Sequence, residues 1–169
     1  MKQFVPVSLA ILILAGACAT MRQSATATLA PTSGNTAAGT VTFAEKKDGS
    51  VQVTVRLTGV PPGVHGFHVH DKGDCGDNGN AAGGHFNPMS APHGAPSDAS
   101  HHAGDFGNVE ADASGSVNES RTLWGITVAP GTTSVVGHAV ILHANADDLK
   151  TQPTGNAGGR IACGVVQMQ

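Results

Sequence analysis

The sequence predicts an all-β protein, built as an antiparallel Greek-key β-sandwich or flattened barrel with two long functional loops. Three observations carry this prediction. Apolar and polar residues alternate in several short segments, as they do in strands with one side on a core. Turn-forming residues separate these segments, since the 169-residue chain holds 23 Gly and 9 Pro. Two long stretches between them are poor in apolar residues and rich in Gly, Asn, Asp and Pro.

The first strand pair is expected near the beginning of the folded part. In 51–57 four apolar residues alternate strictly with polar ones, which is typical of a strand that is half buried. Its partner is expected at 40–45, because the Lys-Lys-Asp-Gly-Ser segment at 46–50 has the composition of a hairpin turn.

A second pair is expected to repeat this arrangement, with 106–111 and 117–124 on either side of a turn at 112–115. A β-branched run at 134–142 and a short closing strand at 160–166 complete the set.

Stretches 71–105 and 144–159 do not fit this scheme. Loops of such length without structure of their own are uncommon in a compact domain and usually carry function. We therefore expect the functional residues in these loops and at the adjoining strand ends.

Residues 1–17 are predicted to be a signal peptide, because Lys2 precedes an apolar run that ends in small residues. The run is too short to span a bilayer as a mature helix. Cys18 follows directly, as at a lipoprotein cleavage site, and its lipidation would attach the protein to a membrane surface. Ala15-Gly-Ala17 equally suits an ordinary signal peptidase, which would release a free protein, so both outcomes stay open. The expected location is the periplasm or cell envelope.

Residues 18–38 show no periodic apolar face and are predicted to be a flexible tether, which leaves 39–169 as one folded domain. Without the signal peptide the chain keeps 8 basic and 12 acidic residues, a net charge of −4. This acidic balance excludes a basic nucleic-acid binder held by phosphate contacts. An aromatic content of 4%, with no Tyr, argues against base-stacking or carbohydrate platforms.

Cys75 and Cys163 remain as an even pair once Cys18 is assigned to the leader junction. In an oxidising compartment such a pair is expected to form a disulfide. The bond would close a long loop and stabilise the fold by about 4 kcal/mol in the chain-entropy model. Two free buried thiols are the alternative.

Histidine is the outlier of the composition, with nine residues. His68 and His70 are two apart in a β pattern, so both imidazoles can reach one metal ion. The polar loop that follows adds further ligand types: His85, His93, His102 and Asp105. Zn²⁺ and similar ions take imidazole nitrogen and carboxylate oxygen, and such an ion would order a loop that lacks apolar surface. His143 ends an apolar strand and supplies one more imidazole.

Five motifs, taken in order, resemble the copper/zinc superoxide dismutases: GFHVH, GGHFNP, HAGDFGNV, LHANADDL and GNAGGRIACGV. The resemblance covers 39–169. Members of this family have a β-sandwich fold, so the resemblance and the predicted fold class are not independent of each other. The setting of Cys75, Asp-Cys-Gly-Asp-Asn-Gly, resembles the bacterial members. The likeness is therefore to a bacterial exported type, and the leader indicates its lipoprotein form, with attachment through Cys18, beside the free form that stays open.

The resemblance implies the roles of the site residues. Copper would be bound by four histidines: His68, His70, His85 and His143. Zinc would be bound by three histidines and one carboxylate: His85, His93, His102 and Asp105. His85 would then bridge the two metals. His102 is preferred to His101, which we expect to be solvated, because His-x-x-Asp is the family spacing. His65 matches a structural position, and His138 has no ligand role.

The resemblance also implies two groups around the metals. Asp147 looks like the outer carboxylate that hydrogen-bonds ligands of both metals. Arg160 would stand beside the open copper face, where its guanidinium offers a charged fork to a small anion. Lys72 and Lys150 are candidates for attracting superoxide, because they are positive residues on the two loops. The loop 144–159 is shorter than in typical eukaryotic members and lacks their charged stretch, so the residues that attract superoxide there cannot be transferred to this chain.

The implied activity is dismutation of superoxide to dioxygen and hydrogen peroxide, as antioxidant defence in the cell envelope. Copper would alternate between Cu(II) and Cu(I) while zinc holds His85. The substrate is the superoxide anion, and the protein is expected to be a monomer or homodimer. Two rival functions are a metal-binding or metal-delivery protein on the same fold and a structural β-sandwich of the envelope.

Overall fold

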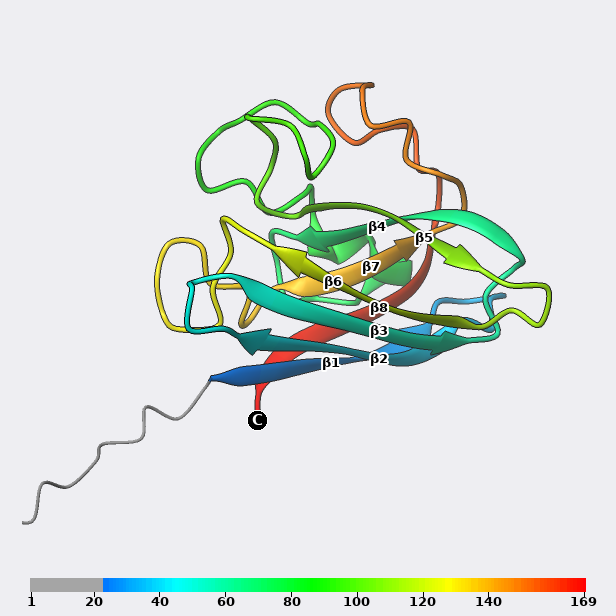
Figure 1. The fold of residues 1–169 in the computed structure, drawn as a ribbon. Coiled ribbons are helices and arrows are strands. Elements are labelled where there is room, and N and C mark those ends of the chain that lie inside the picture. Colours follow the sequence, from blue (N-terminus) through cyan, green and yellow to red (C-terminus); the bar gives the residue numbers. More distant parts are fainter. Residues whose placement is uncertain (1–22) are drawn as a thin grey trace, which may run out of the picture.

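The computed structural model describes residues 23–169, which form eight strands and one short 3-10 helix (Figure 1). The signal peptide predicted at 1–17 and the candidate lipidation residue Cys18 lie outside these residues. The strands are β1 (Ser24–Pro31), β2 (Ala38–Glu45), β3 (Val51–Thr58), β4 (Gly63–His70), β5 (Asp105–Ala111), β6 (Val117–Leu123), β7 (Ala139–His143) and β8 (Arg160–Met168). The 3-10 helix, η1 (Asp77–Ala82), lies between β4 and β5. Within 23–169, none of the helical structure has the length and hydropathy that a membrane span requires.

The strands form one antiparallel sheet in the order β5-β4-β7-β8-β1-β2-β3-β6, and this sheet curls into a nearly closed barrel (Figure 1). The chain crosses between distant positions in the sheet after β3 and again after β6, which is Greek-key connectivity. The predicted all-β, antiparallel fold class is confirmed.

The barrel core follows from the alternation of its strands. In β3 the four apolar residues of the predicted pattern are at most 2% exposed, while Arg56 and Thr58 face solvent. Phe106 fills the interior and makes tilted ring contacts with Phe43 and Phe67, at centroid distances of 6.2 and 6.0 Å. A packed interior of this kind gives the loops at its rim a rigid base.

The prediction of a flexible tether at 18–38 is wrong for 24–31, which form β1 in the middle of the sheet. β1 pairs with both β2 and β8. Ala25, Ala27 and Leu29 are buried and alternate with Ser and Thr residues. The alternation of a strand is therefore present. Two of the three buried apolar residues are Ala, however, and a segment rich in Ala, Ser and Thr has the composition of a linker.

The expected pairing of 106–111 with 117–124 is also wrong, although the turn between them exists. β5 pairs with β4 and β6 pairs with β3, so these consecutive strands are the two edges of the sheet. The guanidinium of Arg121, on β6, donates hydrogen bonds to the carbonyl oxygens of Phe106 and Asn108 on β5. The Arg121 side chain thus supplies hydrogen bonds to backbone carbonyl oxygens at the edge of the sheet, where no neighbouring strand supplies them.

The strand expected at 134–142 begins only at Ala139. Gly137 has φ +85°, a left-handed conformation that interrupts an extended strand. The loops predicted from composition are confirmed, since β4 ends at His70 and β5 begins at Asp105, while β7 ends at His143 and β8 begins at Arg160. Both loops rise on the same side of the barrel (Figure 1).

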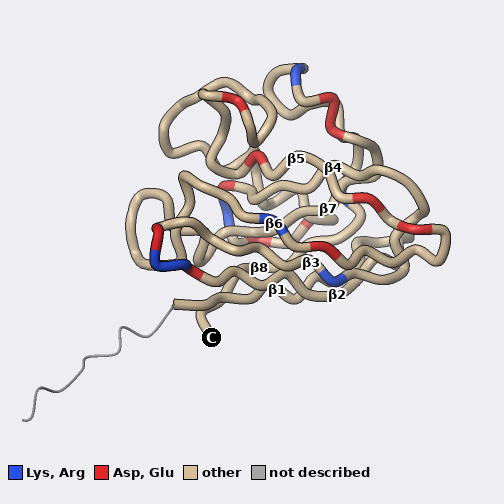
Figure 2. Tube along the Cα trace, in the orientation of Figure 1, with Lys and Arg blue, Asp and Glu red and all other residues tan. Residues whose placement is uncertain are grey.

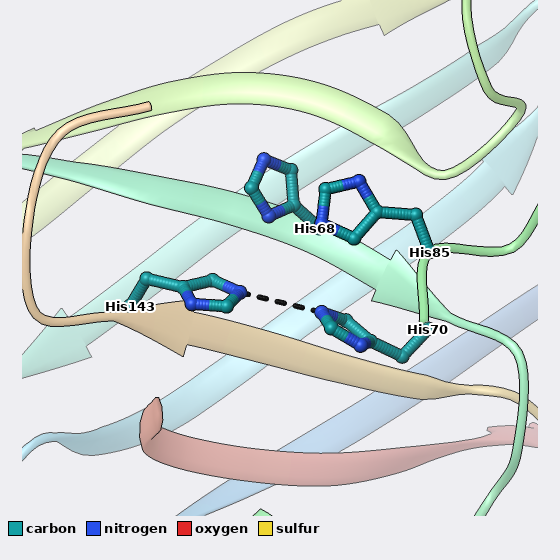
Figure 3. Close-up of side chains that lie close together, drawn as sticks. All are labelled: His68, His70, His85 and His143. Atoms are coloured by element: carbon teal, nitrogen blue, oxygen red, sulfur yellow. Dashed lines mark hydrogen bonds between the residues drawn. The ribbon is translucent and has the colours of Figure 1, made fainter. Parts of the chain in front are cut away.

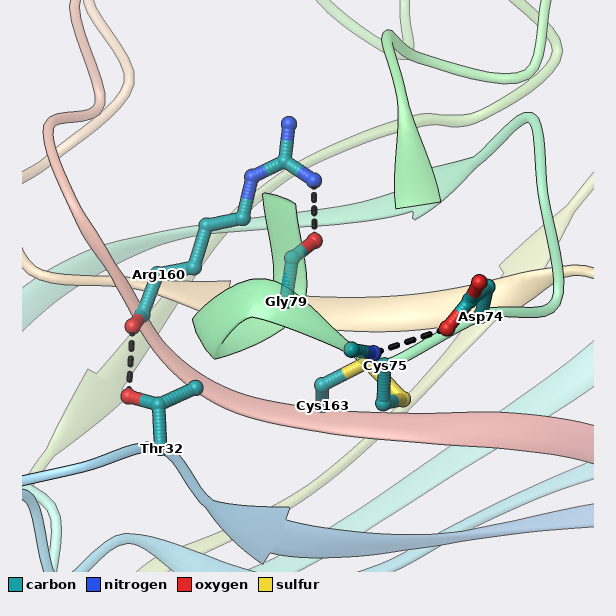
Figure 4. The surroundings of a disulfide bond; sticks show 7 residues. Thr32, Asp74, Cys75, Gly79, Arg160 and Cys163 are labelled. Atoms are coloured by element: carbon teal, nitrogen blue, oxygen red, sulfur yellow. Dashed lines mark hydrogen bonds between the residues drawn. A yellow bond between two sulfur atoms is a disulfide. The ribbon is translucent and has the colours of Figure 1, made fainter. Parts of the chain in front are cut away.

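The predicted disulfide is present between Cys75 and Cys163, with a Cα–Cα distance of 5.7 Å (Figure 4). It attaches the first long loop, just before η1, to the middle of β8.

Candidate metal centre

Strand pairing brings the histidines together. His68 and His70 lie on β4, which pairs with β7, the strand that ends at His143. An isolated bridge places His85 opposite His70. These four rings form the four-histidine group, whose ligand atoms lie within 4.8 Å of one another (Figure 3). All four residues are buried.

A second group shares His85 with the first. This mixed group consists of His85, His93, His102 and Asp105, again buried and with ligand atoms within 4.8 Å of one another. His85 is thus the single residue common to both groups. The structure brings together every histidine and the aspartate that the sequence predicted as ligands.

Hydrogen bonds fix which nitrogen of each ring faces the four-histidine group. Nδ1 of His70 lies 2.9 Å from the carbonyl oxygen of Gly83, and Nδ1 of His143 lies 3.2 Å from that of Gly158. A neutral ring that donates from Nδ1 has a lone pair on Nε2. The two Nε2 atoms face each other at 3.3 Å (Figure 3). With both Nδ1 atoms donating, the two Nε2 atoms that the dashed line of Figure 3 joins each carry a lone pair. Two lone pairs do not hydrogen-bond with each other, so these nitrogens are arranged to share a cation.

His68 and His85 complete this donor set. His68 directs Nε2 to the carboxylate of Asp147 at 2.7 Å, and its Nδ1 is buried without a hydrogen-bond partner. His85 directs Nδ1 to Asp105 at 2.7 Å, and its Nε2 is likewise buried and unpartnered. Buried polar atoms without partners are rare. A copper ion fits this set of imidazole donors.

In the mixed group three Nδ1 atoms converge on one oxygen. Asp105 Oδ1 lies 2.7 Å from His85, 2.9 Å from His93 and 3.2 Å from His102. Its Oδ2 accepts hydrogen bonds from the amides of Gly94 and His102. Three imidazoles and one carboxylate are a donor set that suits tetrahedral zinc.

The protonation states of three histidines and of the aspartate favour metal binding. Burial lowers the pKa of His68 to about 4 and that of His143 to about 3, and it holds the pKa of His70 well below the usual value. Burial would raise the pKa of Asp105, but hydrogen bonds from His85 and the Gly94 amide keep it low. Neutral imidazoles and an ionised carboxylate are the forms that bind metal ions.

Asp147 connects the two groups, as the resemblance implied. Oδ2 lies 2.7 Å from His68 Nε2 and Oδ1 lies 3.0 Å from His93 Nε2. Burial opposes ionisation of Asp147, but the hydrogen bonds that it accepts from His68, His93 and the Leu149 amide together outweigh burial, so its pKa is lowered. The hydrogen bonds that His93 donates to Asp147 and Asp105, together with the negative charges of these carboxylates, outweigh the effect of burial, so the pKa of His93 is raised.

Arg160 lies beside the four-histidine group. It is the cross-strand partner of His143 on β7. Its guanidinium donates to the carbonyl oxygen of Gly79 (Figure 4). It also donates to the carbonyl oxygen of Gly83, which accepts the hydrogen bond from His70 as well. Burial lowers the pKa of Arg160, but a guanidinium stays charged in proteins. A fixed positive charge therefore borders the histidines.

Sequence reasoning missed two amide side chains that hold this site. Asn108 donates to the carbonyl oxygen of Asp147 and accepts from its amide, at 3.0 and 2.7 Å. Gln152 does the same for His93, with both distances 2.8 Å. Each side-chain amide thus makes the pair of hydrogen bonds that a neighbouring backbone would make. Asn108 fixes Asp147 in this way, and Gln152 fixes the ligand His93. Asn108 lies on β5 and Gln152 in the second long loop, and no spacing in the sequence marks these two residues.

The remaining histidines lie outside both groups. Both ring nitrogens of His65 face carbonyl oxygens, those of His143 and Pro61, at 2.8 and 2.7 Å. His101 directs Nδ1 to the carbonyl oxygen of His102. His138 stacks against Phe86 at a centroid distance of 4.0 Å. None of the three therefore contributes to the metal-binding groups among the described residues.

The candidate steering lysines differ in position. The aliphatic part of Lys72 lies over Gly83, the residue whose carbonyl oxygen holds both Arg160 and His70. Lys150 is exposed in the second long loop. Basic residues are few and dispersed along the chain (Figure 2). Lys72 is thus the candidate lysine whose stem lies beside Gly83, the residue that accepts hydrogen bonds from Arg160 and His70.

The barrel directs two buried donor groups onto one shared imidazole, and each group could hold a metal ion. Residues 37–166 match the family model described as copper/zinc superoxide dismutase (SODC), and the chain belongs to this family. A solved structure titled "Crystal Structure Analysis of the clock protein EA4" is similar, with 41% sequence identity and a TM-score of 0.80. The match covers 89% of this chain and 97% of that one.

Proposed function

We propose that the protein is an active superoxide dismutase of the cell envelope. In this proposal the four-histidine group binds copper and the mixed group binds zinc. The observation that carries it is the position of His85, whose Nδ1 faces the mixed group while its Nε2 is buried and unpartnered beside the other. A single imidazolate that serves two different ions needs this arrangement.

When bound, copper supplies the one-electron chemistry that oxidises one superoxide to dioxygen and reduces a second, with two protons, to hydrogen peroxide. Arg160 attracts and orients the anion. A unit-charge attraction at 4 Å is about 4 kcal/mol at an effective dielectric of 20, which orients a small anion without trapping the product. His85 Nε2 is the nitrogen that would hold a proton whenever it is not bonded to the ion.

The export signal in 1–17 and lipid attachment at Cys18 belong to this proposal. They are supported by the sequence pattern and by the disulfide, since such bonds persist in oxidising compartments. A mature chain that retains an acylated Cys18, found by mass spectrometry, would establish attachment, and a chain that begins at residue 18 without acylation would refute it.

The decisive experiment measures metal content and superoxide consumption on the mature protein, with the metal-free protein as control. His85→Ala is expected to abolish most activity and uncouple the metals, and full activity would refute the bridge. Arg160→Ala is expected to lower turnover at low ionic strength with copper content unchanged. A protein that binds both metals but does not consume superoxide would be a metal-binding protein instead.

A further inference from the structure

The turn that follows β1 contacts the backbone of Arg160 (Figure 4). The hydroxyl of Thr32 donates a hydrogen bond to the carbonyl oxygen of Arg160 at 2.7 Å and accepts one from Asn35 Nδ2 at 2.8 Å. The Thr32 amide donates to the carbonyl oxygen of Ile161. The hydroxyl is therefore fixed in direction, and it holds the point from which the Arg160 side chain departs.

The same turn also holds the segment that receives the guanidinium. The Ser33 amide donates to Asn78 Oδ1 at 3.2 Å. Asn78 and Gly79 both have positive φ, +52° and +81°, which Asn and Gly tolerate best. This backbone directs the Gly79 carbonyl oxygen to Arg160. A Cβ on Gly79 would lie only 3.4 Å from Arg160 Cδ, so the glycine lies against the arginine stem.

We propose that Thr32 and Asn78 are positioning residues for Arg160. Thr32 fixes the backbone end of the arginine, and Asn78 ties η1, which holds the guanidinium, to the same turn. The turn precedes residue 37, where the match to the family model begins, so the family match assigns it no role. The inference rests on the proposed function only in treating Arg160 as the anion-binding residue.

The first test uses metal-free protein and does not depend on activity. Phenylglyoxal modifies accessible arginines, and mass spectrometry compares the rate at Arg160 with that at exposed Arg56. Thr32→Val removes the hydroxyl but keeps the shape, and Asn78→Gly removes the acceptor but tolerates the positive φ. Each is expected to raise the relative rate at Arg160 roughly fivefold, the factor that loss of one ordinary hydrogen bond produces. Thr32→Ser keeps the hydroxyl and is expected to match the wild type.

The second test titrates azide, a small monovalent anion, into copper-loaded protein and follows the visible spectrum. Thr32→Val is expected to weaken azide binding roughly fivefold, with Thr32→Ser restoring it. A fall in melting temperature with unchanged azide affinity and unchanged Arg160 reactivity would overturn the proposal, because Thr32 would then only support the fold. If Arg160→Met binds azide like the wild type, the anion-binding role in the proposed function fails, whereas the phenylglyoxal ratio still decides the positioning of Arg160.

Discussion

Replacing Asp147 by Asn is expected to weaken metal binding, because this carboxylate serves both groups. Its two oxygens accept hydrogen bonds from His68 Nε2 at 2.7 Å and from His93 Nε2 at 3.0 Å. Asn has the same shape, but its amide accepts at one end and donates at the other. Either orientation turns an N–H toward one ring N–H, so one of the two groups loses its support.

The expected loss of metal affinity can be judged from other carboxylates that hydrogen-bond metal-binding histidines. Loss of a hydrogen bond to a metal-ligating histidine typically reduces metal affinity 10- to 100-fold, or about 1.4 to 2.7 kcal/mol. Competition with a chelator of known affinity, for copper and zinc separately, would measure it. Asp147→Asn is expected to lose at least about tenfold for one of the two metals.

Asp148→Asn is the matched control, because it removes the same charge from the neighbouring residue. Asp148 accepts hydrogen bonds from Lys150 and Thr151 within its own loop and contacts neither metal-binding group. Wild-type affinity for both metals in Asp147→Asn, or an equal loss in the two variants, would refute the role of Asp147 as the link.

Three further predictions concern stability, pH and rate. Cys75→Ser with Cys163→Ser is expected to lower the free energy of unfolding of the metal-free protein by about 4 kcal/mol, measured with denaturant; a loss below about 1 kcal/mol would contradict it. Acidifying metal-free protein from pH 6.5 to 4 is expected to lower its free energy of unfolding. The pKa of His68 is about 4 in the folded protein and 6.5 ordinarily, so the unfolded chain binds more protons over this range. A free energy of unfolding that holds or rises on acidification would contradict this. Lys72→Glu is expected to slow superoxide consumption roughly threefold at low ionic strength and less at high, with Lys150→Glu affected less, and equal effects would remove the special position of Lys72.

The metal-binding residues could be predicted because metal chemistry restricts residue type. His68 and His70 share a side of one strand by spacing alone, and the long polar loops lack the apolar residues that would make them strands. The remaining ligands could be assigned to one group or the other only through the family resemblance. Strand spacing does not place a loop residue such as His85 opposite a strand residue.

Pairing between strands was less predictable than the strands themselves. Segment 24–31 alternates as far as Leu29, but Ala25 and Ala27 stand where 51–57 has Val, and their small side chains weaken the contrast between the two faces. The turn at 112–115 is the same signal whether it joins a hairpin or, as here, the two edges of a barrel. Which edge a strand meets depends on barrel closure, a property of the whole sheet.

A glycine in the second long loop has a specific role in the metal centre, although the sequence shows it only as part of a glycine-rich loop. Such a stretch is typical of a flexible loop, yet Gly155 has φ +67°, and a Cβ there would collide with Asp147 Oδ1 and lie 2.7 Å from His93 Nε2. On the other side, a Cβ on Gly66 would lie 3.4 Å from Asp147 Cβ and 2.7 Å from Ala157 Cβ. Asp147 can therefore reach both metal-binding groups because Gly155 has no side chain, while the absence of a side chain at Gly66 makes room for Ala157. The glycine of the second long loop thus provides space for the carboxylate that links the two groups.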